Sequence, residues 1–590
     1  MRISIPSSLL LLLLLTATTT PVVAAPNCPP LGPVFEKPRN FASSPTIRAA
    51  IANLTATLQQ RDSDNSPSVL ANETSYSIEI FSAADRDTPL VFSWHHTAPQ
   101  LAAQRFNATG VKKTDADTVY RLGSLTKVFT VYTWLAQDGD AKFNEPITKY
   151  VPELRGRPKG DAISDVDWEQ VTVGSLASQM GGIVRDYGLM GEVTQQINMS
   201  TAVGLGFPPL NGSDSTLPKC GVWPLCDRTE FFNGLLQVAP SYAPHTTPAY
   251  TNTGFQILAY ALESIKGKSF KSMMEESVLR PLGLNRTYYN NAPARVGIIP
   301  GGSTADANWD FQLGDESPAG NMFSSVGDIS ALGRSILRSD ILSAALTRRW
   351  LKPAALTSEP NAGVGYPWGV RRVSLQQENG KRTIDAFNKA GRIGYYSSLM
   401  ILLPDYDVGF SVLIAGPNIP GNTNFNLADL LGAQLLPALE QAGREQAEST
   451  YAGDYYNPER NSSLRITTQS DRPGLGVENW FSNGTYMQYV SVVLQSGYSP
   501  VSPTIRLYPT GLETMLEGGG RRVGYKAVFE DANLPARPNS LFSTDCGTWV
   551  SFTGVAYGTH PLDEFVFELD NGGKVRSVEN KALRVVLPKV

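Results

Sequence analysis

The chain has 590 residues and a formal net charge of −4, with 42% hydrophobic and 18% charged residues. This composition is typical of a folded globular protein and excludes a largely disordered chain. The small negative charge argues against nucleic acid or an anionic membrane as a partner, and the length favours two domains.

The first 25 residues have the features of a cleaved secretory signal. Arg2 gives a basic start, Leu9 to Leu15 form an unbroken leucine run, and Ala24 and Ala25 supply small residues near the expected cleavage site. No later stretch approaches the roughly 18 uncharged apolar residues of a membrane-spanning helix. We therefore expect residues 1–25 to be removed and the mature protein to be secreted, extracellular and without a membrane span.

Eight Asn-x-Ser/Thr sequons are consistent with passage through a glycosylating secretory route. Their asparagines are Asn53, Asn72, Asn107, Asn198, Asn211, Asn285, Asn461 and Asn483. We expect some of them to carry glycans.

Four cysteines are consistent with two disulfides in an oxidising compartment. Cys220 and Cys226 bracket a short loop and are expected to pair with each other, which would leave Cys28 to pair with Cys546, although three pairings are formally open. The chain has only four histidines, which are His95, His96, His245 and His560. A zinc site built on clustered histidines is therefore poorly supported, and we expect no metal and no cofactor.

The first large part of the chain mixes strands and helices. A hairpin is expected at 77–81 and 91–94, and a later pair of apolar strands at 399–403 and 408–415, with mostly helical sequence between them. The amphipathic segment 427–447 is expected to be the closing helix. This order predicts an α/β (α+β) domain in which the first and last strands of an antiparallel sheet meet and a helical lobe is inserted.

The last part of the chain has a different character, because short β-like runs replace the helical periodicity. These runs are 486–494, 504–508, 522–529, 565–569 and 575–578. Asp570-Asn571-Gly572-Gly573, between the last two runs, is a strong hairpin signal. We predict a first domain over 26–447 and an all-β domain over 448–590.

Only one Ser-x-x-Lys occurs in the chain, Ser124-Leu125-Thr126-Lys127, and a mostly apolar run follows it. The run predicts a buried helix that begins close to the serine. A spacing of three residues places the Lys127 amine beside the Ser124 hydroxyl, and burial would lower the pKa of that amine so that it can take the serine proton. Taken alone, the same pattern also fits a helix N-cap followed by a surface lysine.

Two further motifs follow in the chain. Tyr250-Thr251-Asn252 precedes an apolar helix expected at 254–265, and Lys389-Ala390-Gly391 precedes the strand pair that starts at 399. A tyrosine hydroxyl near amines can move protons, and an asparagine amide can hold a substrate. On an edge strand, a Lys-x-Gly would place a cation over the acyl site, and its glycine would let a substrate approach the backbone closely.

The three motifs, in this order, resemble those of the serine β-lactamase, penicillin-binding protein, DD-peptidase and esterase family. Other segments resemble family patterns too, namely Val171 to Gly182, with Gln179-Met180 where the family usually has His-Thr, Arg280 to Leu284, and Pro318 to Ser325. The resemblance covers about residues 35–440 and points to the tyrosine-containing, class C-like branch. It implies a β-lactamase/transpeptidase-like fold, and the β-rich tail is similar to that of secreted fungal β-lactamase-like proteins.

The resemblance also implies roles for individual residues. Ser124 would attack the substrate carbonyl, and Lys127 and Tyr250 would share the base and acid work. Asn252 would help to position the substrate, and Lys389 would support the tyrosine or a substrate anion. The backbone N–H groups of Ser124 and of Arg392, which follows Gly391, would hold the oxyanion.

One departure from the family pattern bears on the substrate. The middle residue of the Lys-x-Gly motif is often a Thr or Ser that binds a substrate carboxylate, whereas here it is Ala390. The missing hydroxyl removes a contact worth roughly 1.5–3 kcal/mol to a charged acceptor. This favours an ester or another acyl compound over a β-lactam, although Lys389 and Arg392 could still meet an anion.

Several alternatives stay open at this stage. No Gly-x-Ser-x-Gly occurs, which argues against an α/β-hydrolase with a Ser-His-Asp triad. An acyltransferase or transesterase, and a β-lactamase-like binding module without turnover, remain alternatives to a hydrolase. The expected partner is a small-molecule or peptide acyl substrate. The sequence identifies neither the natural substrate nor the oligomeric state.

Overall fold

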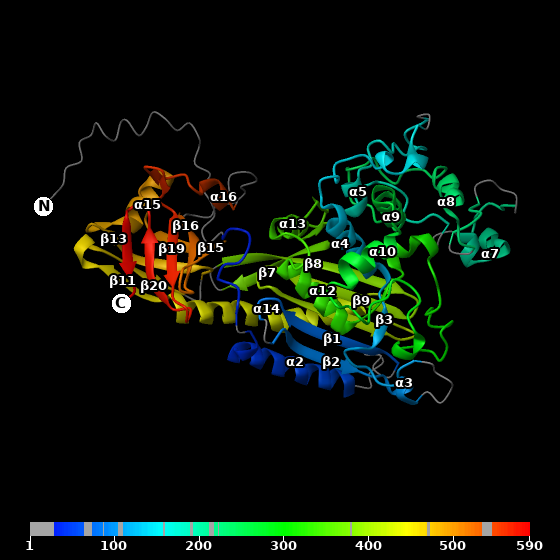
Figure 1. The fold of residues 1–590 in the computed structure, drawn as a ribbon, viewed down its shortest axis with the longest axis horizontal. Coiled ribbons are helices and arrows are strands. Elements are labelled where there is room, and N and C mark those ends of the chain that lie inside the picture. Colours follow the sequence, from blue (N-terminus) through cyan, green and yellow to red (C-terminus); the bar gives the residue numbers. More distant parts are fainter. Residues whose placement is uncertain are drawn as a thin grey trace. The chain divides into compact units, whose positions relative to one another are not determined.

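The computed structural model describes residues 29–39, 41–63, 73–85, 88–103, 110–156, 160–188, 193–211, 217–221, 224–377, 380–468, 472–533 and 546–590. The chain divides into two compact units (Figure 1). One unit holds the described part of Met1–Lys37 together with Ser374–Ile384 and Glu440–Val590, and the other holds Pro38–Val373 and Asp385–Leu439. The sequence-based boundary at 447/448 falls inside a helix, α14 (Thr423–Tyr451), and stays a prediction.

An eight-stranded sheet runs through the first large part of the chain (Figure 1). In sheet order its strands are β2 (Leu90–His96), β1 (Ser75–Ser82), β10 (Val408–Ala415), β9 (Tyr396–Leu403), β8 (Gly380–Ile393), β7 (Gly369–Gln377), β6 (Ala362–Val364) and β5 (Ala355–Leu356). β1 pairs antiparallel with β2 and also with β10, where Ile78 faces Val412. The expected meeting of the first and last strands is therefore confirmed.

Both faces of β1 are covered, which explains why all its residues are buried. Tyr76 donates a hydrogen bond of 2.5 Å to Asp62 near the end of α2 (Pro45–Ser63). Phe81 packs against Gly333 of α12 (Val326–Arg338). Successive side chains of a strand point to opposite faces, so positions 76 and 81 lie on opposite sides and the two helices cover different faces of the sheet.

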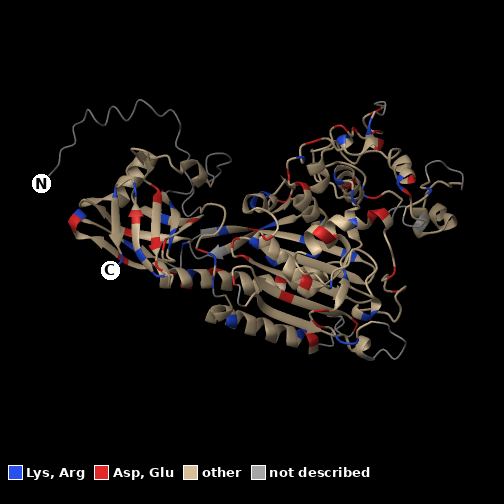
Figure 2. Cartoon of the chain, in the orientation of Figure 1, with Lys and Arg blue, Asp and Glu red and all other residues tan. Residues whose placement is uncertain are grey.

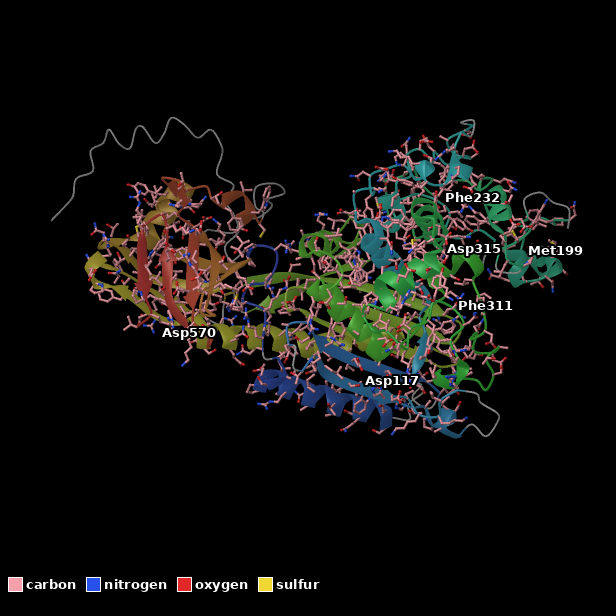
Figure 3. All side chains as sticks on the ribbon, viewed as in Figure 1. Asp117, Met199, Phe232, Phe311, Asp315 and Asp570 are labelled. Atoms are coloured by element: carbon pink, nitrogen blue, oxygen red, sulfur yellow. A yellow bond between two sulfur atoms is a disulfide. The ribbon has the colours of Figure 1, made fainter. Side chains whose placement is uncertain are left out.

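The helical lobe lies in sequence between β2 and β5 and contains both helices predicted around the motifs. α4 (Thr126–Asp138) is buried from Thr126 to Leu135, as expected for the helix after Ser124. α9 (Thr253–Lys266) covers the helix expected at 254–265. Phe232 and Asp315 both lie in this lobe (Figure 3). Phe232 packs on Tyr260, whose hydroxyl donates a hydrogen bond of 2.7 Å to Asp315.

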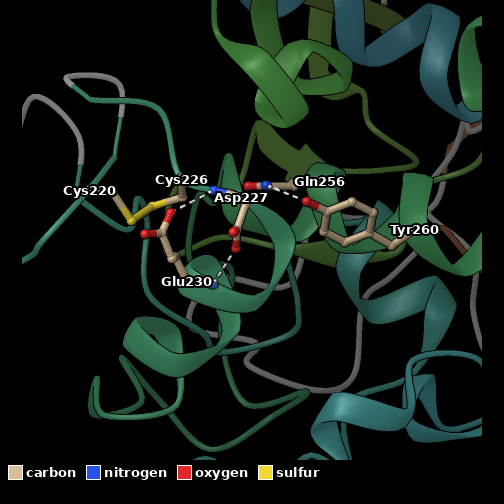
Figure 4. Close-up of a disulfide and its surroundings, with 6 residues drawn as sticks. All are labelled: Cys220, Cys226, Asp227, Glu230, Gln256 and Tyr260. Carbon is tan, nitrogen blue, oxygen red and sulfur yellow. Dashed lines mark hydrogen bonds between the residues drawn. A yellow bond between two sulfur atoms is a disulfide. The ribbon is translucent and has the colours of Figure 1, made fainter.

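The predicted disulfide between Cys220 and Cys226 is confirmed (Figure 4). It leads into α8 (Arg228–Leu235), where Asp227 and Glu230 form a reciprocal capping box with each other's backbone N–H. Cys546 is also disulfide-bonded. The partner expected for it, Cys28, lies outside the described residues.

The C-terminal domain is built on a nine-stranded antiparallel sheet. In sheet order its strands are β11 (Gly453–Asn457), β12 (Ser462–Thr467), β13 (Leu475–Ser482), β15 (Pro503–Met515), β16 (Arg521–Asp531), β19 (Glu564–Leu569), β20 (Val575–Asn580) and β21 (Val585–Pro588), with β14 (Thr485–Tyr486) beside β13. A bridge between Tyr455 and Lys589 joins the two ends of this order, so that the sheet forms a near-barrel. The predicted hairpin at 570–573 is confirmed, because β19 pairs with β20.

One predicted strand of this domain is wrong. Residues 486–494, read as a β run, form helix α15 (Met487–Ser496) except for Tyr486, which ends β14. Its buried residues Met487, Ser491 and Val492 recur at helical spacing. The β-branched valines favour a strand intrinsically, but packing of this segment against the sheet overrides that preference and a helix forms.

Acidic and basic residues are interspersed along the chain in both units (Figure 2). The six sequon asparagines within the described ranges are exposed, whereas Asn72 and Asn107 lie outside those ranges. Among the helices of the described residues, none combines the length and apolarity that crossing a bilayer requires.

Candidate active site

Ser124 lies on a tight turn, Gly123–Leu125, immediately before α4. Gly123 has φ +53°, and a Cβ atom there would lie 2.5 Å from the backbone nitrogen of Arg392. Glycine is therefore needed both for the left-handed conformation and for the close approach. Gly123 and Leu125 are buried while Ser124 is partly exposed, so the turn presents the serine hydroxyl.

The side chain of Lys127 is fully buried one helical turn after the serine. Its Nζ donates three hydrogen bonds, at 3.1 Å to Ser124 Oγ, 2.5 Å to Asn252 Oδ1 and 2.7 Å to the backbone oxygen of Ala319. An ammonium group has three donors, so this set satisfies all of them. The surface-lysine alternative for the Ser-x-x-Lys motif is thereby excluded.

Tyr250 reaches the same hydroxyl from a distant loop. Its phenol donates a hydrogen bond of 2.5 Å to Ser124 Oγ. The loop is held by Thr251, whose N–H donates to Gln179 Oε1 at 2.7 Å, and by Asn252, whose N–H donates to the oxygen of Arg185 at 2.8 Å. Gln179, where the resembled family usually has histidine, thus anchors the tyrosine loop.

The Lys-x-Gly motif lies on β8, and the strand pair β9 and β10 follows it in the chain as predicted. β8 is an interior strand in the sheet order, so the expectation of an edge strand is wrong as stated. β7 begins at Gly369, whose backbone oxygen accepts a hydrogen bond from Asn388, and β8 continues past that point through Lys389 to Ile393. The motif therefore lies where β8 extends beyond its shorter neighbour.

The glycine of this motif touches the nucleophile turn. A Cβ atom at Gly391 would lie 2.0 Å from the oxygen of Leu122 and 2.7 Å from the backbone nitrogen of Ser124. Lys389 Nζ donates to the oxygen of Ala390 at 2.6 Å and lies 5.6 Å from the ring centroid of Tyr250. The neighbouring Arg392 is exposed, and its guanidinium donates to the oxygen of Ile419 at 2.8 Å.

Burial sets the electrostatics of the site. It lowers the pKa of Lys127 to about 7, against the opposing effects of Glu316 and Asp186. It lowers the pKa of Lys389 to about 8. It raises the pKa of Glu316 to about 8, and the Asp186 carboxylate adds to that rise. Near neutral pH a large fraction of Lys127 is therefore unprotonated and able to accept a proton.

The structure thus brings Lys127 and Tyr250 into hydrogen-bond contact with the Ser124 hydroxyl, and Asn252 into contact with Lys127. Lys389 lies beside the tyrosine ring, and Gly391 lies against the turn that carries Ser124. Three residues that surround Lys127 were not predicted from the sequence. Ala319 acts through a backbone oxygen, which no side-chain motif reveals. Asp186 and Glu316 approach Lys127 only in the folded chain.

We find no group of three histidine, cysteine or acidic side chains placed to hold a metal among the described residues. At the site itself, the side chains supply a serine hydroxyl, two amines and a phenol. Such a set can transfer an acyl group to and from a serine.

Comparisons with known proteins identify the family of the chain. A family model described as "Beta-lactamase" matches residues 84–431, and one described as "Beta-lactamase-like-like, C-terminal domain" matches residues 443–590. The chain is similar to a "Beta-lactamase-like protein" of Arthroderma benhamiae, with 29% identity over 590 residues, 95% of this chain and 96% of that protein. It is 25% identical over 536 residues to "Probable hydrolase M10" of a Phoma species, covering 88% of this chain and 85% of the relative. It is 24% identical over 311 residues to "D-alanyl-D-alanine-carboxypeptidase/endopeptidase AmpH" of Escherichia coli, covering 50% of this chain and 71% of the relative.

Proposed function

The chain belongs to the beta-lactamase family, and from that premise we propose that it is a serine hydrolase that forms an acyl-enzyme on Ser124 with an ester or amide substrate. One observation carries the proposal. Ser124 Oγ lies within hydrogen-bond reach of both Lys127 Nζ, at 3.1 Å, and the Tyr250 hydroxyl, at 2.5 Å. A base and an acid are thus in place on the two sides of one nucleophile.

In the proposed acylation step, Lys127 takes the hydroxyl proton as Ser124 Oγ bonds to the carbonyl carbon. The backbone N–H groups of Ser124 and Arg392 hold the oxyanion, because the two backbones meet at Gly123 and Gly391. Collapse of the tetrahedral intermediate breaks the bond to the alcohol or amine, which leaves with the Tyr250 proton. Lys127 then returns its proton to the tyrosine.

In the proposed deacylation step, water attacks the ester formed on Ser124. Lys127 takes a proton from the water as the water oxygen bonds to the acyl carbon, and Tyr250 gives its proton to Ser124 Oγ as the bond between that oxygen and the acyl carbon breaks. Lys127 then returns its proton to the tyrosine, so that the free acid leaves and the starting state is restored. Lys389, 5.6 Å from the Tyr250 ring centroid, favours the phenolate that forms when the tyrosine gives up its proton. No metal or cofactor enters either step.

The substrate proposal is that an ester is preferred to a β-lactam. Ala390 offers no hydroxyl to a substrate carboxylate, and the Lys389 ammonium beside it donates to the oxygen of Ala390 at 2.6 Å. A β-lactam would therefore lose a contact worth roughly 1.5–3 kcal/mol. An ester without a carboxylate at that position loses nothing.

The proposal is tested with a panel of chromogenic esters, amides and β-lactams, run on the secreted protein and on Ser124→Ala. We expect turnover of esters above that of β-lactams, and its loss in Ser124→Ala. Ser164→Ala, at an exposed serine, is the matched control and should keep the rate. Equal turnover by the wild type and Ser124→Ala would refute the mechanism, and stoichiometric labelling without turnover would indicate an acyl-binding protein.

We also propose that the protein is secreted and glycosylated. The signal-like residues 1–25 and the exposed sequon asparagines support secretion and glycosylation. Expression of the full chain in a eukaryotic host should release protein that begins near residue 26 and loses mass on treatment with an endoglycosidase. Retention in the cell with residues 1–25 attached would contradict it.

A further inference from the structure

We propose that Asp186 is a positioning residue for the Ser124–Lys127 pair, because its carboxylate fixes the orientation of the Asn252 amide. The inference rests on the proposed function. Asp186 is hydrogen-bonded to Asn252, which in turn accepts from Lys127, and the Asp186 charge also acts on Lys127 through space.

Asp186 is built into the site. Its side chain is only 11% exposed, Oδ1 accepts a hydrogen bond of 2.6 Å from Asn252 Nδ2, and Oδ2 pairs with Arg185 Nε at 3.2 Å. The backbone oxygen of Arg185 accepts from Asn252 N–H at 2.8 Å, and the oxygen of Val184 accepts from the Thr251 hydroxyl at 2.9 Å. These contacts keep the segment that carries Asp186 in register with the loop that carries Asn252.

The two ends of the Asn252 amide meet groups of opposite kind. Asn252 is the N-cap residue of α9, but its side chain makes no capping bond to the helix. Its oxygen accepts from Lys127 and its nitrogen donates to Asp186. A carboxylate only accepts and an ammonium only donates, so a flipped amide would place like groups together at both ends. Only one orientation satisfies both partners.

That orientation matters for the base. The Lys127 ammonium has three donors, and the oxygens of Asn252 and Ala319 take two of them at 2.5 Å and 2.7 Å. The third is then directed at Ser124 Oγ. When the ammonium loses this third proton, the lone pair of the neutral amine takes its place and faces the serine hydroxyl. Without the Asn252 oxygen, Nζ loses one of its two fixed anchors and can drift from the serine. A displacement of about 1 Å at a reacting group can cost on the order of 100-fold in rate.

The charged and titratable groups that face Lys127 are Asp186, Glu316 and Arg185, with Tyr250 and Lys389 nearby. The Asp186 carboxylate opposes the fall in the Lys127 pKa that burial causes. Removing that negative charge should therefore lower the pKa of Lys127 further, so that the lysine stays unprotonated to a lower pH. A residue with a purely structural role would not move the pH profile in this way.

The test begins with Asp186→Asn, which keeps the size of the side chain but can donate as well as accept. We expect kcat to fall about 10- to 100-fold with a smaller change in KM, and the acidic limb of the pH profile to move to lower pH. Asp186→Glu keeps an acceptor-only group and should retain more activity than Asp186→Asn. Asp161→Asn, at an exposed acid, is the control and should keep kcat.

A double-mutant cycle with Asn252→Ala measures whether the effect of Asp186 on kcat depends on Asn252. If Asp186 positions Lys127 through Asn252, Asp186→Asn should change kcat less than about twofold once Asn252 is alanine, with kcat compared on the plateau at higher pH where Lys127 is neutral in every variant. The same fold-loss in both backgrounds would overturn the inference, as would wild-type kcat in a folded Asp186→Asn protein. Should Asp186→Asn not fold, Asp186→Glu takes its place in the cycle. Acylation of Ser124 in the wild type is measured alongside, and its absence would refute the proposed function itself.

Discussion

The hydroxyl of Tyr250 donates a hydrogen bond of 2.5 Å to Ser124 Oγ, across 126 residues of sequence. This contact joins the loop before α9 to the turn before α4. In both places the motif residue stands immediately before a buried helix. The proposed acid and the proposed nucleophile therefore each lie immediately before a buried helix of the same lobe.

Replacing this phenol by a phenyl ring tests its role as the acid. Tyr250→Phe should lower the acylation rate with an alkyl ester or an amide about 10²- to 10⁴-fold, because the leaving group then departs without a proton. The loss of acylation rate should be much smaller for an aryl ester whose leaving group needs no protonation. Single-turnover kinetics with the two substrates measure acylation apart from deacylation, in which Tyr250 also takes part, with Tyr242→Phe at an exposed tyrosine as control. An equal loss on both substrates would contradict the assignment.

The approach of Gly391 to the nucleophile turn predicts intolerance of any side chain there. In Gly391→Ala the new Cβ would lie 2.0 Å from the oxygen of Leu122, so the turn or β8 must shift. Displacing the oxyanion donors should cost about 10²- to 10³-fold in kcat. Gly204→Ala, where a Cβ meets nothing within 4 Å, is the matched control. Unchanged kcat in a folded Gly391→Ala protein would rule out an oxyanion site at this contact.

The lowered pKa of Lys127 predicts a pH dependence. Its amine accepts a proton only when neutral, so kcat/KM should rise with pH as the pH passes through about 7, the pKa that burial gives this lysine. The rate is measured between about pH 5.5 and 8.5. Lys127→Arg, whose guanidinium stays protonated, should be inactive across that range. A flat profile for the wild type would show that another group is the base.

The disulfide between Cys220 and Cys226 should contribute to stability and not to chemistry. The loop that it closes is short, with a sequence separation of 6, so its loss should cost only about 2 kcal/mol in the free energy of unfolding. Cys220→Ser with Cys226→Ser should therefore unfold at lower denaturant while acylating Ser124 at the normal rate. Denaturant titration and a single-turnover assay provide the two readouts, and a lost acylation rate with intact stability would be the opposite of this expectation.

The sequence predicted those parts of the site in which neighbours in sequence are neighbours in space. Ser124 and Lys127 share a helix face, so their contact follows from a spacing of three residues. The contact with Tyr250 depended on the order of the motifs and on family resemblance. Asp186 and Ala319 could not be predicted, because one joins the site through a loop and the other through a backbone oxygen.

The elements of the fold also divide into those that local sequence predicted and those that it did not. The hairpin of β1 and β2 and the pair β9 and β10 are apolar runs with polar turns between them, and they were predicted at nearly their observed positions. The range of β8 was not among the predicted strands. The Lys-x-Gly motif was expected on an edge strand, whereas β8 is an interior strand, because strand neighbours are set by pairing between segments far apart in the sequence.

The proposed mechanism requires a covalent acyl bond to the Ser124 hydroxyl. Mass spectrometry of the quenched reaction detects this bond most directly. The protein is mixed with an excess of a slowly hydrolysed ester, stopped with acid within the first turnover and digested. We predict that the acyl mass appears on the peptide that contains Ser124, and that Ser124→Ala acquires none. An acyl mass on a different residue, or turnover at the wild-type rate by Ser124→Ala, would contradict the account.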